Sequence, residues 1–142
     1  MDLKQMYREI VNEHNLHPTH KYDLDTPTVV LRGVNPSCGD DITLQLKVED
    51  GVITDGSYNG VGCAISQASA DMMLDLVIGK ETAEAERLMD IFNRMITGEV
   101  SEEELEDIDE AAALQDIAHM PARVKCAKLG WRTLGEILGQ QE

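Results

Sequence analysis

Residues 42–52 read Ile-Thr-Leu-Gln-Leu-Lys-Val-Glu-Asp-Gly-Val, and they decide the fold. Apolar residues alternate with polar ones up to Glu49, which is the pattern of a strand with one buried face. Asp50-Gly51 then provides the strongest short signal for a tight hairpin turn. The chain is therefore expected to return from Val52 as an antiparallel strand. That strand ends in the glycine-rich run 55–62, where backbone segments can approach closely or bulge.

Cysteines flank this hairpin on both sides. Before it, residues 35–40 read Asn-Pro-Ser-Cys-Gly-Asp and form a tight loop, because the proline fixes one backbone angle and the glycine permits a sharp turn. After it, Cys63 follows the glycines and opens a helix, where the free N–H groups favour a thiolate. Antiparallel pairing should bring Cys38, Asp40 and Cys63 together at one end of the sheet.

The three cysteines and one aspartate form a candidate metal site. The third cysteine lies five residues after Pro121. Three thiols and a carboxylate provide the four ligands of a tetrahedral zinc or iron centre. Taken singly, each cysteine is more commonly a buried free thiol, Asp40 could merely close the turn, and Asp41 could replace it as the ligand. All three cysteines lie at junctions between elements, which favours a shared site whose ligands are Cys38, Asp40, Cys63 and Cys126.

Helical patterns surround the hairpin. Ser101 and Glu104 form a capping box that opens an acidic helical segment, which has few large apolar residues and is expected to pack loosely on the surface. The order of elements predicts one α+β domain over residues 1–142, with a small three-stranded antiparallel sheet and helices packed on one face. The other predicted elements are a helix over 2–14, a connector over 15–27, a strand over 28–34, and helices over 64–79, 82–97 and from 121 onward.

Helical spacing also predicts which side chains face the core. Cys126 is expected to lie beside the core face of the last helix rather than on it. The predicted core face of the helix after Cys63 is Ala64, Ile65, Ala68, Met72 and Leu76, that of the 82–97 helix is Leu88, Ile91, Phe92, Met95 and Ile96, and that of the last helix is Val124, Ala127, Trp131, Leu134 and Leu138.

The composition excludes several functional classes. A formal net charge of −15 argues against partners that are nucleic acids or anionic membranes. No apolar run reaches the roughly 20 residues of a membrane span, and the N-terminus lacks the apolar segment of a signal peptide. Three cysteines without a Cys-x-x-Cys pair make a poor disulfide framework. A cytoplasmic protein whose partners are proteins or metal ions is therefore expected.

The histidines carry a weaker signal. His14, His17 and His20 could bind a metal ion, but solvated loop histidines are commoner, so we assign them no site role. His119 is a candidate to support Cys126 from outside the ligand set. Arg123 and Lys125 flank Cys126, where they are either solvated charges or electrostatic support for a thiolate.

Three motifs resemble a known family. They are residues 35–40, residues 60–66 (Gly-Val-Gly-Cys-Ala-Ile-Ser) and residues 124–131 (Val-Lys-Cys-Ala-Lys-Leu-Gly-Trp). Together and in this order they resemble the U-type iron–sulfur assembly proteins, which comprise the IscU/NifU-like scaffolds and their SufU branch.

The departures from the scaffold pattern resemble the SufU branch. Lys125 stands where the scaffolds carry a histidine, and residues 120–124 lack their Leu-Pro-Pro-Val-Lys chaperone motif. The acidic stretch at about 98–119 resembles the insertion that marks SufU proteins.

The resemblance implies a zinc-dependent sulfurtransferase with a SufE/NifU-like fold. One zinc ion would be bound by Cys38, Asp40, Cys63 and Cys126. Cys38, the catalytic residue, would take persulfide sulfur from a SufS-like cysteine desulfurase, while a partner histidine replaces it on zinc. The sulfur would pass to downstream iron–sulfur assembly proteins, and the desulfurase would dock at the N-terminal helix and the rim of Cys38. The alternatives are a scaffold that assembles a [2Fe–2S] cluster on the same ligands, and a zinc ion that only stabilises the fold.

Overall fold

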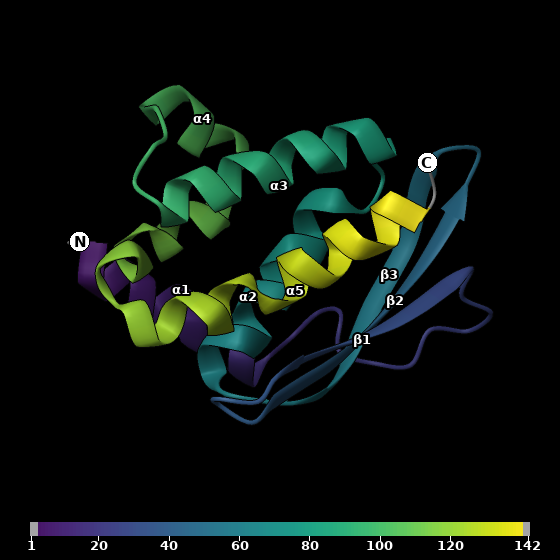
Figure 1. Ribbon diagram of the computed structural model, residues 1–142, viewed down its shortest axis with the longest axis horizontal. Coiled ribbons are helices and arrows are strands. Elements are labelled where there is room, and N and C mark those ends of the chain that lie inside the picture. The colour runs from purple at the N-terminus through teal and green to yellow at the C-terminus, as the bar shows by residue number, and fades with distance from the viewer. Residues whose placement is uncertain (1–2, 141–142) are drawn as a thin grey trace.

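The computed structural model describes residues 3–140 as one sheet with helices packed on one of its faces. Figure 1 shows this arrangement, which confirms the predicted α+β class. The elements in chain order are α1 (Leu3–Leu16), β1 (Val29–Asn35), β2 (Asp40–Glu49), β3 (Val52–Val61), α2 (Ala64–Val77), α3 (Thr82–Ile96), α4 (Glu102–Asp107), the 3-10 helix η1 (Asp109–His119) and α5 (Pro121–Gln140). The predicted helix start at Asp2 lies outside the described residues.

The sheet is built around the predicted hairpin. The strand order is β1-β2-β3, and both pairings are antiparallel. Asp50 and Gly51 both have positive φ (51° and 77°), which is the backbone of a two-residue turn that follows the strand twist. Ile42, Leu44 and Leu46 are fully buried beneath the helices. The register pairs Asn35 with Asp40 and Asp41 with Val61, so the loop before β2 and the end of β3 lie close together at the same end of the sheet.

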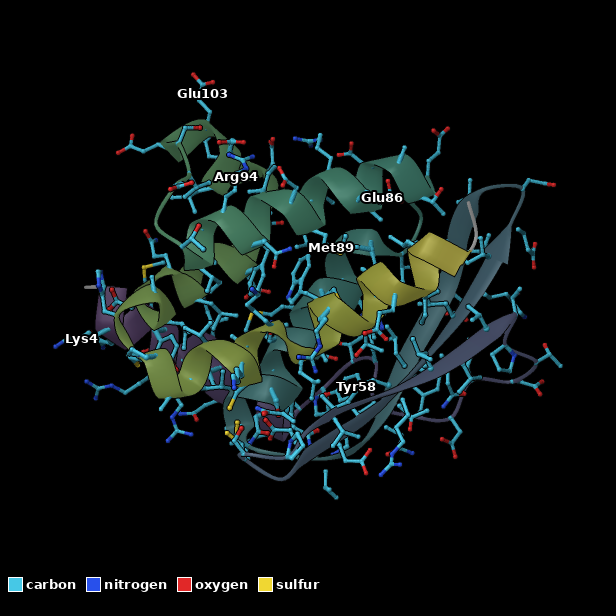
Figure 2. All side chains as sticks on the ribbon, viewed as in Figure 1. Lys4, Tyr58, Glu86, Met89, Arg94 and Glu103 are labelled. Carbon is cyan, nitrogen blue, oxygen red and sulfur yellow. The ribbon has the colours of Figure 1, made fainter. Side chains whose placement is uncertain are left out.

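The core lies between the sheet and the helices. Helices α2 and α5 contact the strands, and α1, α3 and η1 pack on these two helices. Tyr58 is fully buried in the sheet, whereas charged side chains such as Lys4 and Glu103 are exposed on the outside of the helical layer (Figure 2). Within residues 3–140, no helix is long and apolar enough to cross a membrane.

Helix α2 corrects one sequence prediction. Of its predicted core face, Ala64, Ile65 and Leu76 are only half-buried, while polar residues such as Ser69 and Asp71 are buried. A single core stripe was expected, but α2 lies between the sheet and four other helices (α1, α3, η1 and α5) and is buried on nearly all sides. The predicted core face of α3 is confirmed, and that of α5 is confirmed except for the half-buried Val124.

The acidic segment corrects a second prediction, because it does not pack loosely. Ile108, Ala111, Leu114 and Ile117 are each at most 1% exposed and belong to the main core. These residues recur every third position. Since a 3-10 helix has three residues per turn, this spacing places the side chains of Ala111, Leu114 and Ile117 on one face of η1, in line with its N-cap residue Ile108. The acidic residues between them occupy the solvent side.

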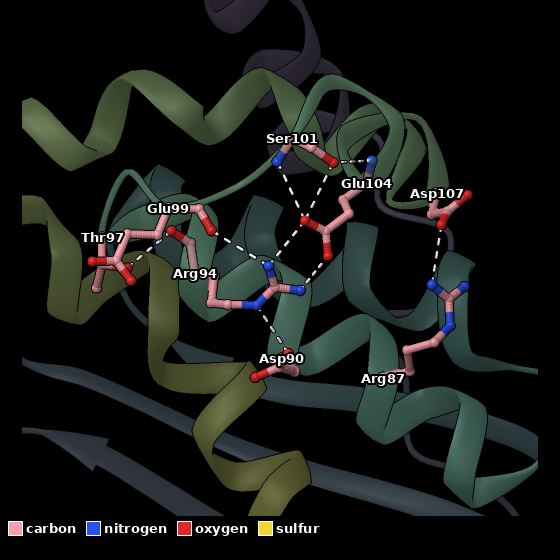
Figure 3. A network of polar contacts seen from close by, with 8 residues as sticks. All are labelled: Arg87, Asp90, Arg94, Thr97, Glu99, Ser101, Glu104 and Asp107. Carbon is pink, nitrogen blue, oxygen red and sulfur yellow. Dashed lines mark hydrogen bonds and ion pairs between the residues drawn. The ribbon is translucent and has the colours of Figure 1, made fainter.

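Arginines of α3 attach the acidic segment to the body (Figure 3). Arg94 binds the Glu104 carboxylate with two nitrogens and also reaches Asp90 at 3.0 Å. Arg87 reaches Asp107 at 3.0 Å. Glu104 is also half of the predicted capping box, in which the Ser101 hydroxyl accepts a hydrogen bond from the Glu104 N–H. One carboxylate therefore caps α4 and docks it on α3.

Acid should weaken this docking within a defined pH range. The hydrogen bonds from Arg94 and from Ser101 lower the pKa of Glu104 from 4.5 to about 2. Because the folded pKa is below the unfolded one, the stabilisation is present above pH 4.5 and is lost as the pH falls towards 2. We expect Glu104→Gln to lower the urea midpoint at pH 7 and to approach the wild-type midpoint at pH 2.

The matched control for this measurement is Glu103→Gln, which neutralises an exposed carboxylate on the same helix. Its urea midpoint should stay close to that of the wild type at every pH. If the urea midpoint of Glu104→Gln stayed equally far below the wild-type value down to pH 2, the ionised Glu104 carboxylate would not be the source of the stabilisation.

Candidate metal centre

The loop between β1 and β2 places Cys38 at the surface. Gly39 adopts φ +72°, and the Cys38 N–H donates to the Asn35 carbonyl at 3.2 Å, which closes the predicted tight turn. Cys38 is exposed, while Asp40, two residues on, is fully buried. The turn therefore presents a thiol to solvent and directs a carboxylate inward.

Asp40 lies at the centre of the site. Its Oδ1 accepts hydrogen bonds from the Cys63 N–H at 2.9 Å and the Ser66 hydroxyl at 3.2 Å, and its Oδ2 is 3.4 Å from Asn35 Nδ2. Asp41, the alternative ligand, instead forms a bidentate ion pair with the exposed Arg32 at 2.6 and 2.8 Å. Asp40 is therefore the aspartate that faces the cysteines.

Helices α2 and α5 position the other two cysteines. Cys63 is the N-cap of α2, and its Sγ accepts a hydrogen bond from the Ser66 N–H at 3.4 Å. Cys126 lies in the second turn of α5 and is fully buried, with its Sγ 3.3 Å from the Cys38 Sγ. Cys126 lies outside the main apolar cluster, which agrees with its predicted position beside the core face, and its thiol is buried next to the β1–β2 loop that carries Cys38.

The structure brings three of the four predicted ligands into one group. Donor atoms of Cys38, Asp40 and Cys126 all lie within 4.8 Å of one another. The Cys63 Sγ is outside that group, although the residue adjoins it through the N–H bond to Asp40. Three thiols and one buried carboxylate are a donor set that suits zinc or iron.

The site changes the acidity of its innermost thiol. Burial raises the pKa of Cys126 strongly, and hydrogen bonding to Cys38 and the proximity of Cys63 and Asp40 raise it further. Cys126 therefore stays protonated near neutral pH in the metal-free protein. A cation bound among these groups would lower the pKa of the Cys126 thiol, because it stabilises the thiolate.

Two residues that support the site could not be singled out from the sequence. Asn35 is 4% exposed and directs its amide towards Asp40 and, at 3.9 Å, towards Cys126 Sγ. Ser66 donates a hydrogen bond to Asp40 and is buried in the first turn of α2. The only signal for either was its place inside a cysteine motif. Among the described residues, we find no hydrogen bond from Arg123, Lys125 or His119 to the four candidate ligands, and all three are exposed.

The family model of the NifU-like N-terminal domain matches residues 6–134. The chain is 43% identical over 138 residues to the iron–sulfur cluster assembly scaffold protein IscU of Thermotoga maritima, covering 97% of this chain and 96% of that protein. It is 35% identical over 141 residues to the zinc-dependent sulfurtransferase SufU of Bacillus subtilis, covering 99% and 95% respectively.

A solved structure shares the fold as well as the sequence similarity. The crystal structure of FiSufU from Fervidobacterium islandicum AW-1 superposes with a TM-score of 0.85 at 34% identity, covering 94% of this chain and 97% of that one. The family match and the two nearly full-length relatives confirm the resemblance that the three cysteine motifs indicated. The chain belongs to the IscU/NifU-like family, whose members share the NifU-like N-terminal domain.

Proposed function

We propose that this protein serves iron–sulfur cluster assembly as a zinc-dependent sulfurtransferase, which accepts persulfide sulfur from a SufS-like cysteine desulfurase. The observation that carries the proposal is the graded exposure of the thiols, since Cys38 is exposed, Cys63 is half-buried and Cys126 is buried. A sulfur acceptor must meet the active site of another protein, and only an exposed loop thiol can do so. The SufU relative, which aligns with 99% of this chain, supports the same function.

The donor set fits one zinc ion held by Cys38, Asp40, Cys63 and Cys126. Burial and the contacts from Cys63, Ser66 and Asn35 hold Asp40 in one orientation. A bound zinc ion would supply charge that keeps the coordinated thiols deprotonated near pH 7.

The transfer step needs only a thiolate at Cys38. The Cys38 sulfur attacks the outer sulfur of the desulfurase persulfide, so one S–S bond forms as another breaks. The desulfurase cysteine leaves as a thiolate and Cys38 becomes the persulfide, with no net oxidation or reduction. Downstream iron–sulfur assembly proteins would then accept the sulfur.

The second candidate function is a scaffold that builds a [2Fe–2S] cluster on the same residues. It is supported by the Thermotoga maritima relative, which is named a scaffold protein and is 43% identical. Both relatives align with nearly the whole chain, so the segment at 98–119 does not distinguish the two functions. The bound metal does distinguish them.

Metal content is the first test of the proposal. Protein purified without oxygen should contain about one zinc per chain, no acid-labile sulfide and no visible absorption. Asp40→Ala should lose most of this zinc, because it removes the buried ligand. Asp41→Ala is the matched control and should keep it, since Asp41 pairs with Arg32. Iron and sulfide in comparable amounts would support the scaffold function instead.

A further inference from the structure

A buried histidine lies in a polar cluster that the cysteine site does not use. His14 was expected to be a solvated histidine, but it lies on α1 and is only 7% exposed. Its Nδ1 is 2.7 Å from Oδ2 of Asp71 on α2, and its Nε2 is 3.1 Å from Oε1 of Glu110 on η1. Three segments that are distant in sequence thus meet at one imidazole.

The Asp71 carboxylate fixes the orientation of this imidazole. Asp71 is fully buried and also accepts hydrogen bonds from the backbone N–H groups of His20 at 2.8 Å and Thr19 at 3.3 Å. It therefore cannot turn away from His14 without losing backbone partners. A carboxylate that holds one ring nitrogen and leaves the other pointing at oxygen ligands is the usual support of a metal-binding histidine.

A second carboxylate completes the donor group. Oxygen atoms of Asp75 and Glu110 and a ring nitrogen of His14 all lie within 4.8 Å of one another. Asp75 is itself oriented by His20, whose Nε2 lies 2.7 Å from Asp75 Oδ1. The side chains of Asp75 and Glu110 are 42% and 54% exposed, so both can adjust to a ligand.

A cavity of about 310 Å³ opens beside these side chains. Asp75, Glu110 and Asp109 contribute its polar wall, and Met72, Leu76 and Ala111 its apolar wall. It has room for an ion together with water ligands.

We propose that His14, Asp75 and Glu110 bind one divalent metal ion of the first transition series. One imidazole and two carboxylates suit ions such as Mn²⁺, Fe²⁺ and Zn²⁺. The separation of 3.1 Å between His14 Nε2 and Glu110 Oε1 matches two neighbouring ligands of one ion, since metal–ligand bonds here are about 2.0–2.2 Å. Because its ligands come from α1, α2 and η1, the ion would link the acidic segment to the helical layer. This inference does not depend on the proposed function of the cysteines.

Mn²⁺ is the probe, because it prefers nitrogen and oxygen ligands to thiolates. Titration of the full chain, followed by the six-line EPR signal of free Mn²⁺, should show one site per chain. Glu110→Gln and Asp75→Asn each replace a charged carboxylate ligand by a neutral amide on a partly exposed side chain, and each should weaken that site at least about tenfold.

The matched control is Asp109→Asn, which removes the same charge from the same cavity without touching the proposed ligands. Asn tolerates the positive φ of 52° at this position, so the fold should persist. Mn²⁺ should raise the thermal midpoint of the wild type and of this control, but not that of Glu110→Gln. No binding by the wild type, unchanged binding by Glu110→Gln, or equal weakening in the control would overturn the proposal.

Discussion

Cys38→Ser should abolish the acceptance of persulfide sulfur and return the stimulated activity of a cysteine desulfurase to its unstimulated level. Cys38 is the only exposed cysteine of the three, and serine keeps its approximate size while removing the thiol nucleophile. A serine hydroxyl is not ionised near pH 7 and is a far weaker nucleophile than a thiolate, so it cannot accept the sulfur in its place. The buried Cys126 cannot take over the reaction with a second protein.

The measurement is the intact mass of the chain after a single turnover with desulfurase and cysteine. Wild type should gain the mass of one sulfur atom, and Cys38→Ser should gain none. Asp41→Ala changes a surface residue close to the same loop and should gain sulfur normally. If Cys38→Ser still gained sulfur, the acceptor would be Cys63. If it lost stability but left desulfurase stimulation intact, the metal would only stabilise the fold.

The parts of the site that the sequence predicted are those fixed by local structure. Asp50-Gly51 determines the hairpin register, and this register in turn brings the loop at residues 35–40 next to the segment before Cys63. Each cysteine motif carries its own turn or helix start. The proximity of Cys38, Asp40 and the backbone of Cys63 could therefore be predicted from the alternation of apolar and polar residues and from the turn residues alone.

Features that depend on packing between distant segments could not be predicted. The burial of Cys126 depends on how α5 packs against β1 and β2, which no local pattern encodes. Apolar residues recur at every third position over residues 108–117, and this is visible in the sequence. The spacing fits neither an α-helix nor a strand, however, and the acidic residues around it indicated an exposed segment instead.

The histidine cluster depends on still longer separations. The carboxylates that hold His14 lie 57 and 96 residues further along the chain. Read by itself, His14 is one polar residue near the end of an amphipathic helix, for which solvent exposure is the ordinary expectation. Only the packing of α2 and η1 against α1 reveals its partners.

Trp131→Ala should cause a large loss of stability. The Trp131 ring on α5 is fully buried and stacks on Phe92 of α3, with centroids 4.3 Å apart and planes inclined by 7°. Its Nε1 donates to the Ser69 hydroxyl of α2 at 3.1 Å, and that hydroxyl donates to the Ala127 carbonyl of α5 at 2.7 Å. Truncation of such a residue costs about 3–5 kcal/mol, a large part of the 5–15 kcal/mol that is typical of a domain.

The same residue connects the fold to the metal centre. Trp131 and Ser69 join α5 to α2, the two helices that carry Cys126 and Cys63. Trp131→Ala should therefore lower zinc affinity as well as the urea midpoint, although it contacts none of the ligands. Trp131→Phe is the intermediate control, because it keeps an aromatic ring but loses part of the ring volume and the hydrogen bond, the latter at a cost of about 1 kcal/mol. Urea unfolding and zinc competition with a chelator should rank wild type, Trp131→Phe and Trp131→Ala in that order. Equal zinc affinity in all three would show that the β1–β2 loop and Asp40, rather than the helix pair, determine the geometry of the site.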